Sequence, residues 1–315
     1  MKELVSVVIP NYNRANIIQR AISSALNQTY SNVEVIVVDD CSTDNSKNIL
    51  TAIEQKNEQV RVFFSTNNRG ANYCRNVGVK KAKGKFIAFL DSDDEFLPDK
   101  ISKCLEISNE KKADLVFSDF INHGAINRKF SDSKEINLSD IILSNSIGGF
   151  SVIFAKKNII EKSGFLNENM PSCQDWDFML NTIPYVRAYY YSGALVNYYQ
   201  QADSITKNIS KVLKGHIKIF KKINILNDEY QIYDTDKLLS HQKKFLGIIL
   251  FKHRNIKEAR ILFLESLKIK FTFDGMLRYC STFIPYDIIK YLKKLRNIIY
   301  IKFFDEYKNV KNKYN

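Results

Sequence analysis

The first 120 residues alternate short apolar runs with segments of helical periodicity, and this alternation constrains the fold more than any other feature of the sequence. Apolar, β-branched runs of this length are typical of strands that are buried on both faces of a sheet. Strands separated by helices join into a parallel sheet through right-handed crossovers. The sequence therefore predicts an α/β fold with a mainly parallel, mixed sheet flanked by helices. The expected strands are VSVVIP at 5–10, VEVIVVD at 33–39, VRVFFS at 60–65, KFIAFL at 85–90 and DLVFS at 114–118.

Polar clusters follow four of these expected strands. In sheets of this kind, ligands bind in the crevice beyond the carboxyl ends of the strands. We therefore expect the four clusters to meet at one edge of the sheet and to form a binding site there. The clusters are PNYNR at 10–14, DDCSTD at 39–44, NNRG at 67–70 and DSD at 91–93.

The cluster after the fourth strand carries four acidic side chains in five positions, 91–95. Asp91 and Asp93 flank Ser92, and both carboxylates would point the same way if the strand continued through them. Two hard oxygen ligands on one side suit Mg²⁺ or Mn²⁺ shared with phosphate oxygens. The alternative is a solvated acidic turn that leads into a helix opened by Pro98. Both interpretations stay open on this motif alone.

Other polar residues at strand ends also have two interpretations. Asp39 and Asp40 could accept hydrogen bonds from a base or a ribose, or could cap the next helix. Arg69 and Arg75 could contact a diphosphate or only solvent. No GxGxxG follows the first strand and no GxxxxGK[ST] occurs, which disfavours dinucleotide and P-loop sites.

A later acidic segment, QDWDF at 174–178, places aspartates on both sides of Trp176. An aspartate beside an apolar ring can have a raised proton affinity and act as a general base. Asp175 and Asp177 are both candidates, and a purely structural role is the alternative for each.

Five motifs in order resemble the family 2 inverting glycosyltransferases of the GT-A fold, which transfer sugars from nucleotide diphosphates. The resemblance covers about residues 4–207. The motifs are SVVIPNYNR at 6–14, VVDDCSTDNS at 37–46, NNRGANYCRNVG at 67–78, FLDSDDEFLPD at 89–99 and QDWDF at 174–178.

The resemblance implies a role for each matching position. Asp175 would be the general base that deprotonates an acceptor hydroxyl. Asp93, with Asp91, would bind a Mn²⁺ or Mg²⁺ cofactor that bridges the two phosphates. Many relatives carry a histidine where this chain has Gln201, so that contact would lack its charge. The implied nucleotide-binding residues are Pro10, Tyr12, Arg14, Asp39, Asp40, Arg69, Arg75, Asp91 and Ser92, and the implied loop contacts to phosphate are Gln201, Ser204, Thr206 and Lys207.

The net charge of +13 is concentrated in the last third of the chain. Residues 1–209 carry 24 Lys and Arg against 24 Asp and Glu, whereas residues 210–315 carry 23 against 10. We expect a catalytic domain over 1–209, with a nucleotide-binding half at about 1–120 and an acceptor-side half at 121–209. Residues 210–315 would form a basic helical region. Its interleaved Lys and apolar residues suit amphipathic helices on anionic lipid, or helices that pack on the core with their lysines in water.

The resemblance implies an enzyme, a hexosyltransferase, that uses UDP-hexose or UDP-N-acetylhexosamine. The expected acceptor is a lipid-linked glycan of O-antigen, capsule or other bacterial surface polysaccharide. Five scattered cysteines without CxxC spacing suit a reducing cytoplasm. No run of about 18 apolar residues occurs, so we expect a cytoplasmic protein that is peripheral on the inner face of the plasma membrane.

The sequence also allows three rival interpretations. A nucleotidyltransferase also uses paired carboxylates and a divalent cation, but no basic, glycine-rich triphosphate loop follows the first strand. A nucleic-acid-binding protein would use the basic region, which matches no recognised binding module, so we expect no nucleic-acid partner. A noncatalytic relative is disfavoured by intact Asp91, Asp93 and Asp175, with Gln201 the one sign in its favour.

Overall fold

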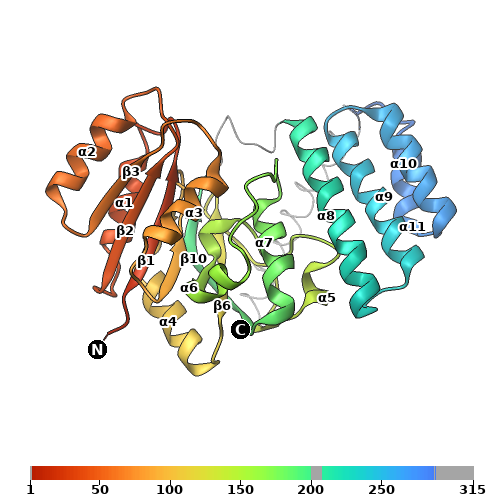
Figure 1. Ribbon diagram of the computed structural model, residues 1–315. Helices are drawn as coiled ribbons and strands as arrows, with labels where there is room; N and C mark the ends of the chain where they lie inside the picture. Colours follow the sequence, from red (N-terminus) through yellow and green to blue (C-terminus); the bar gives the residue numbers. More distant parts are fainter. Residues whose placement is uncertain (1, 200–207, 287, 289–315) are drawn as a thin grey trace, which may run out of the picture. The chain divides into compact units, whose positions relative to one another are not determined.

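The computed structural model describes residues 2–199, 208–286 and 288, and all structural statements below refer to these residues (Figure 1). The chain forms two compact units, residues 1–225 and residues 226–315. The division falls within helix α8 (Ile209–Tyr230), whereas the sequence places the start of the basic region at residue 210. The assignment of separate roles to these regions stays a prediction.

The first unit is built on a ten-stranded mixed sheet with flanking helices (Figure 1). The strand order is β3-β2-β1-β4-β9-β6-β10-β5, with β7 beside β6 and β8 beside β10. The pairs β2–β3, β1–β2, β1–β4 and β6–β10 are parallel, while β9 runs antiparallel between β4 and β6. The strands are β1 (Val5–Asn11), β2 (Val33–Asp39), β3 (Val60–Phe64), β4 (Phe86–Phe89), β5 (Glu95–Phe96), β6 (Leu115–Asn122), β7 (Ala125–Asn127), β8 (Lys134–Ile136), β9 (Phe154–Lys156) and β10 (Ala188–Tyr198).

Helices connect and cover these strands. The prediction of an α/β fold with a mainly parallel sheet and a helical C-terminal region is confirmed. In the first unit the helices are α1 (Ile18–Leu26), α2 (Ser46–Lys56), α3 (Ala71–Lys81), α4 (Lys100–Glu110), α5 (Leu138–Ile141), α6 (Lys157–Lys162) and α7 (Gln174–Thr182), with short 3₁₀ turns η1 (Phe150–Val152) and η2 (Ile183–Tyr185).

Burial follows the predicted pattern in the central strands but not at the edge. Every residue of β1, β2 and β4 is buried. In β3 only Val60 is buried, so the prediction that this strand is buried on both faces was wrong. The reason is its position: β3 ends the strand order, and an edge strand has one neighbour and less cover.

Helix α3 packs closely on β1, because Gly78 allows it. A Cβ atom at Gly78 would lie 2.3 Å from Cγ1 of Val8. This close approach brings Arg75, on the same helix, to the carboxyl end of β1 and β4. The packing of one glycine therefore helps to place a cation at the sheet edge.

The second unit is helical. Helices α9 (Thr235–Lys252), α10 (Ile256–Ile269) and α11 (Phe273–Ser281) follow the end of α8. The α9 and α10 backbones approach closely, since Ser240 donates a hydrogen bond to the Ser266 carbonyl (2.9 Å) and a Cβ at Gly247 would lie 2.7 Å from the Phe263 ring. Over the described residues, none of the helices combines the length and apolar character needed to cross a bilayer.

Candidate active site

A cavity of about 550 Å³ lies at the carboxyl ends of β1, β2 and β4. We call it the carboxyl-edge cavity. Residues from all four predicted polar clusters line it, so the expected convergence is confirmed. The predicted site residues on its wall are Pro10, Tyr12, Arg14, Asp40, Arg75, Asp91, Ser92 and Asp93, and they are joined by Asn11, Asn13, Asn68, Gly70, Ala71, Cys74, Tyr198, Tyr199 and Lys211.

The acidic cluster forms a turn instead of continuing the strand. β4 ends at Phe89, and the backbone N–H of Asp94 donates to the carbonyl of Asp91 (3.0 Å). The strand therefore does not continue through Asp91 and Asp93, and strand alternation does not orient their carboxylates. The Asp91 carboxylate accepts a 2.5 Å hydrogen bond from Arg75, whose guanidinium lies 3.9 Å from the Phe150 ring centre. One carboxylate of the cluster is thus neutralised by a buried arginine that is 5% exposed.

The third carboxyl of the cluster, Asp94, is buried and does not line the cavity. It is 1% exposed and accepts hydrogen bonds from the Ser151 hydroxyl (2.5 Å) and the Tyr199 backbone N–H (3.1 Å). Burial, and then the neighbouring charges of Asp91 and Asp93, raise the pKa of Asp94 well above its usual range. A protonated Asp94 removes one negative charge, so the cluster is less repulsive than its sequence suggests.

Arg20, in α1, holds the Asp91–Asp94 turn from the other side. Its guanidinium donates to the backbone carbonyl of Asp93 (2.5 Å) and lies 3.7 Å from the centre of the Tyr199 ring. The Tyr199 hydroxyl in turn donates to Glu95 (3.0 Å). Sequence reasoning missed Arg20, because no motif marks it and it is 73 positions away from Asp93.

Asp39 and Asp40 organise the loops around the cavity. Asp39 is buried and accepts hydrogen bonds from the Asn11 side chain (2.7 Å) and the Ser42 hydroxyl (2.6 Å). The two oxygens of Asp40 accept from the backbone N–H groups of Arg69 (2.8 Å) and Gly70 (2.7 Å). Asp40 also lines the cavity, whereas Asp39 does not.

Two further predicted residues do not line the carboxyl-edge cavity. Arg69 pairs with Glu168 (3.1 Å) and lies 3.8 Å from the Tyr73 ring centre. Asp175 belongs to α7 and is described next. The predicted loop contacts lie outside the described residues; they are Gln201, Ser204, Thr206 and Lys207.

Asp175 lies in the first turn of α7 and is partly buried. Its carboxylate accepts a 2.6 Å hydrogen bond from the Asn145 side chain. Burial raises the pKa of Asp175, while hydrogen bonds, including that from Asn145, act in the opposite direction. The adjacent Gln174 accepts a 3.3 Å hydrogen bond from Arg75, which connects the start of α7 to the cavity wall. A carboxylate with a raised pKa, next in sequence to a partner of the cavity-lining Arg75, suits a general base.

Asp177, the other candidate base, has different partners from Asp175. Asp177 is 2% exposed and accepts a hydrogen bond from Lys222 of α8, which also contacts Asn181 (2.9 Å). The Trp176 indole between the two aspartates donates to the Ile141 carbonyl (2.8 Å) and anchors α7 in the core. The two aspartates therefore differ in surroundings: Asp177 forms an ion pair with Lys222, whereas Asp175 forms none with any residue that the structure describes.

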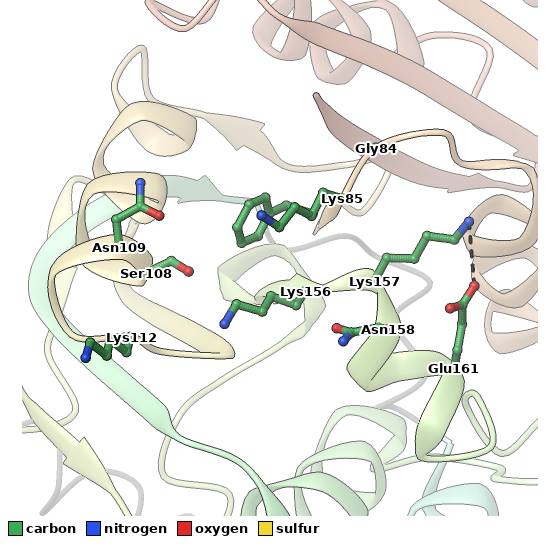
Figure 2. Close-up of a pocket in the computed structure, with 10 residues that line it drawn as sticks. Gly84, Lys85, Ser108, Asn109, Lys112, Lys156, Lys157, Asn158 and Glu161 are labelled. Atoms are coloured by element: carbon green, nitrogen blue, oxygen red, sulfur yellow. Dashed lines mark ion pairs between the residues drawn. The ribbon is translucent and has the colours of Figure 1, made fainter. Parts of the chain in front are cut away.

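A larger cavity of about 750 Å³ lies at the amino end of β4, away from the predicted residues (Figure 2). Several lysines line it, and two of those at its wall form ion pairs. Lys156 pairs with Asp114 (2.8 Å), and Lys157 lies 3.6 Å from Glu161, as the dashed line in Figure 2 shows. Size alone therefore does not identify the site, and the chemistry favours the smaller cavity.

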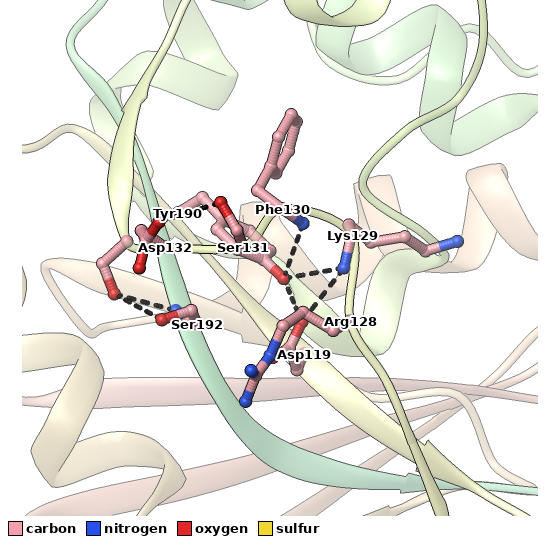
Figure 3. Close-up of polar contacts among 9 residues, drawn as sticks. Asp119, Arg128, Lys129, Phe130, Ser131, Asp132, Tyr190 and Ser192 are labelled. Carbon is pink, nitrogen blue, oxygen red and sulfur yellow. Dashed lines mark hydrogen bonds and ion pairs between the residues drawn. The ribbon is translucent and has the colours of Figure 1, made fainter. Parts of the chain in front are cut away.

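A buried polar cluster joins β6, β10 and the segment 128–130 (Figure 3). Asp119 on β6 is fully buried and accepts a hydrogen bond from the Tyr190 hydroxyl. The backbone N–H of Lys129 donates to the same hydroxyl (3.0 Å), and that of Phe130 approaches it (3.4 Å). Burial and the bond to Asp119 raise the pKa of Tyr190 to about 12. The cluster, which sequence reasoning missed, attaches the segment 128–130 to the sheet.

Comparison with solved structures supports the same architecture. The mannosyltransferase PcManGT from Pyrobaculum calidifontis, solved in complex with GDP-Man and Mn²⁺, has a TM-score of 0.58 to this chain at 15% identity. The similarity covers 94% of this chain and 88% of that chain. The sheet and its carboxyl-edge cavity thus belong to a GT-A-like fold.

The sequence comparisons define the family. Residues 6–175 match the family described as Glycosyl transferase family 2, and this chain belongs to that family of glycosyltransferases. It is 26% identical over 306 residues to the GalNAc(5)-diNAcBac-PP-undecaprenol beta-1,3-glucosyltransferase of Campylobacter jejuni, with 93% of this chain and 97% of the relative covered. It is 32% identical over 230 residues to the UDP-Glc:alpha-D-GlcNAc-diphosphoundecaprenol beta-1,3-glucosyltransferase WfaP of Escherichia coli, with 71% of this chain and 88% of the relative covered.

Proposed function

We propose that this glycosyltransferase moves a hexose or N-acetylhexosamine from a UDP-linked donor to a hydroxyl of an undecaprenyl-diphosphate-linked glycan, with inversion at the anomeric carbon. The acceptor class follows from the relatives of Campylobacter and Escherichia, both of which are named for undecaprenol-linked substrates. The donor class follows from the UDP-Glc in the name of the Escherichia relative. The observation that carries the proposal is the convergence of Asp40, Arg75, Asp91 and Asp93 on one cavity at the carboxyl edge of a parallel sheet.

The residues present fit a divalent cation that is shared with a diphosphate. Asp91 and Asp93 offer carboxylate oxygens on the same cavity wall, and such hard ligands suit Mg²⁺ and Mn²⁺. The described residues contain no group of three His, Cys, Asp or Glu side chains that could hold a metal ion by themselves. Phosphate oxygens and water would therefore complete the ligand set. When bound, such a cation supplies charge neutralisation for the departing diphosphate.

In the proposed reaction, the chain's own residues position the donor and move one proton. Asp40 and the loop it holds lie where the nucleoside would bind, and Arg75 fixes Asp91 beside the phosphates. Asp175 takes the proton from the acceptor hydroxyl, and the acceptor oxygen attacks the anomeric carbon. The bond between that carbon and the diphosphate oxygen breaks on the opposite side, so UDP departs and the configuration is inverted. An α-linked donor then yields a β-linked product.

The basic C-terminal region supports peripheral association with an anionic membrane, where a lipid-linked acceptor resides. On α8, Lys214, Ile217, Lys218 and Lys221 are exposed. Such a mixture of cations and apolar side chains suits the surface of anionic lipid. Full-length protein is expected to float with phosphatidylglycerol vesicles at low salt but not with phosphatidylcholine vesicles. Equal flotation with both would contradict an electrostatic attachment.

The donor site is tested by calorimetric titration of UDP into the wild type and an Asp93→Ala variant, each with Mn²⁺ and with a chelator. We expect UDP to bind more tightly with Mn²⁺ in the wild type, and this metal dependence to be lost in the variant. A wild type that binds no UDP in either condition would refute the donor assignment. Titrations of GDP and dTDP would then show whether another base is recognised.

A further inference from the structure

We infer that Lys211, in the first turn of α8, contacts the diphosphate of the donor in the carboxyl-edge cavity. This inference rests on the proposed function and adds a binding residue to it. Lys211 belongs to none of the motifs that show the family resemblance, and in the sequence it is part of the basic C-terminal region. Nevertheless it lines the same cavity as Arg75 and Asp93.

The backbone around Lys211 is attached to the segment that precedes the candidate base. The Lys211 N–H donates to the Asn208 side chain (3.0 Å), and the Lys211 carbonyl accepts from the Ser172 hydroxyl (3.1 Å). Ser172 stands only three positions before Asp175. The N–H and the carbonyl of Lys211 therefore both have side-chain partners, and the carbonyl is bound by a residue that precedes α7.

Close packing strengthens this attachment one turn further along α8. A Cβ atom at Gly215 would lie 2.0 Å from the Ser172 hydroxyl oxygen, so only glycine allows this approach. His216 lies 3.4 Å from the Cys173 sulfur, and its Nδ1 donates to the Val212 carbonyl (2.8 Å). The position of Lys211 at the cavity thus follows from several contacts of α8 with residues 172–173.

A diphosphate bound in this cavity would be stabilised by a cation that is not already paired with a carboxylate. Asp40, Asp91 and Asp93 line the cavity together with the cations Arg14, Arg75 and Lys211, and a diphosphate would bring further negative charge. The terminal nitrogens of Arg75 are already bonded to Asp91, Asn72 and Gln174.

Lys211, by contrast, is exposed, and among the described residues no ion pair engages its ammonium group. Lysine is a compact charge that suits phosphate, and its place in the first turn adds the positive end of the helix. These features fit a diphosphate contact better than a role in the fold.

The test compares UDP with uridine, which lacks phosphate, in full-length protein with Mn²⁺. Calorimetry measures UDP affinity, and saturation-transfer NMR measures uridine binding. We expect Lys211→Ala to weaken UDP binding by about 10-fold to 100-fold, the range for a charge-assisted hydrogen bond, and to leave uridine binding unchanged. Lys211→Arg should restore most of the UDP affinity. Lys214→Ala is the matched control, since Lys214 is an exposed lysine of the same helix that does not line the cavity.

Two results would overturn the inference alone. One is a Lys211→Ala variant that binds UDP as tightly as the wild type, and the other is an equal loss of UDP and uridine binding, which indicates a general change of the cavity. A wild type that binds no UDP would instead overturn both the proposed function and this inference.

Discussion

Replacement of Asp175 by asparagine is expected to lower the turnover number for sugar transfer by about 10²–10⁴-fold, the usual contribution of a general base. The amide has nearly the same size as the carboxyl group but cannot take the acceptor proton. Because Asp175 does not line the carboxyl-edge cavity, UDP affinity should stay close to that of the wild type. The variant therefore separates chemistry from donor binding.

The pH dependence follows from the surroundings of Asp175. Burial raises its pKa, and only the ionised carboxylate can act as a base. The rate should therefore fall as the pH drops through this raised pKa, above the value of about 3.9 for a free aspartate. The Asn145 side chain opposes the shift by its 2.6 Å hydrogen bond to the carboxylate.

Removal of this hydrogen bond should shift the acid limb of the pH–rate profile by an amount that can be measured. A hydrogen bond to a charged group contributes about 1.5–3 kcal/mol, and one pKa unit corresponds to about 1.36 kcal/mol. Asn145→Ala should therefore move the acid limb of the profile upward by about one to two pH units. The rate above this limb should change much less.

The assay is UDP release from UDP-glucose with a lipid-linked acceptor, measured as kcat/KM between pH 4 and 9. Asp177→Asn is the control: it removes the carboxylate that pairs with Lys222 and should lower the melting temperature, while the acid limb stays in place. An acid limb that does not move in Asn145→Ala, or full activity in Asp175→Asn, would refute the assignment of Asp175 as the base.

Two further predictions concern residues that support the site. Arg20→Gln removes the charged donor to the Asp93 carbonyl and should weaken Mn²⁺-dependent UDP binding by about 10-fold or more in calorimetry, with a smaller loss when Mn²⁺ is chelated. An equal loss in both conditions would show that Arg20 acts on the whole cavity and not on the turn. Tyr190→Phe removes a donor to the buried Asp119 and should lower the free energy of unfolding by about 1–3 kcal/mol in urea denaturation. A variant as stable as the wild type would mean that Asp119 has a replacement partner.

Much of the sheet could be predicted because the apolar, β-branched residues of its long strands indicate that these strands are buried. β1 and β2 are runs of Val and Ile that occur at the predicted positions. The short strands could not be predicted: β5 and β9 have two and three residues, too few for any periodicity, and they form because a neighbouring strand pairs with them. The partial exposure of β3 was missed for a related reason: the residues of a single strand do not show whether that strand lies at the edge or in the centre of the sheet.

The same division applies to the candidate site. The sequence by itself determined which chemical groups stand at the strand ends, because each group directly follows its strand in the chain. These groups meet because the carboxyl ends of neighbouring parallel strands lie at the same edge of the sheet. Only the tertiary structure decided their partners and charge states: Arg75 neutralises Asp91, burial favours a protonated Asp94, and Lys211 reaches the cavity from a distant helix. The physical reason is that a pKa and an ion pair depend on distance and burial, and these are set by how remote segments pack.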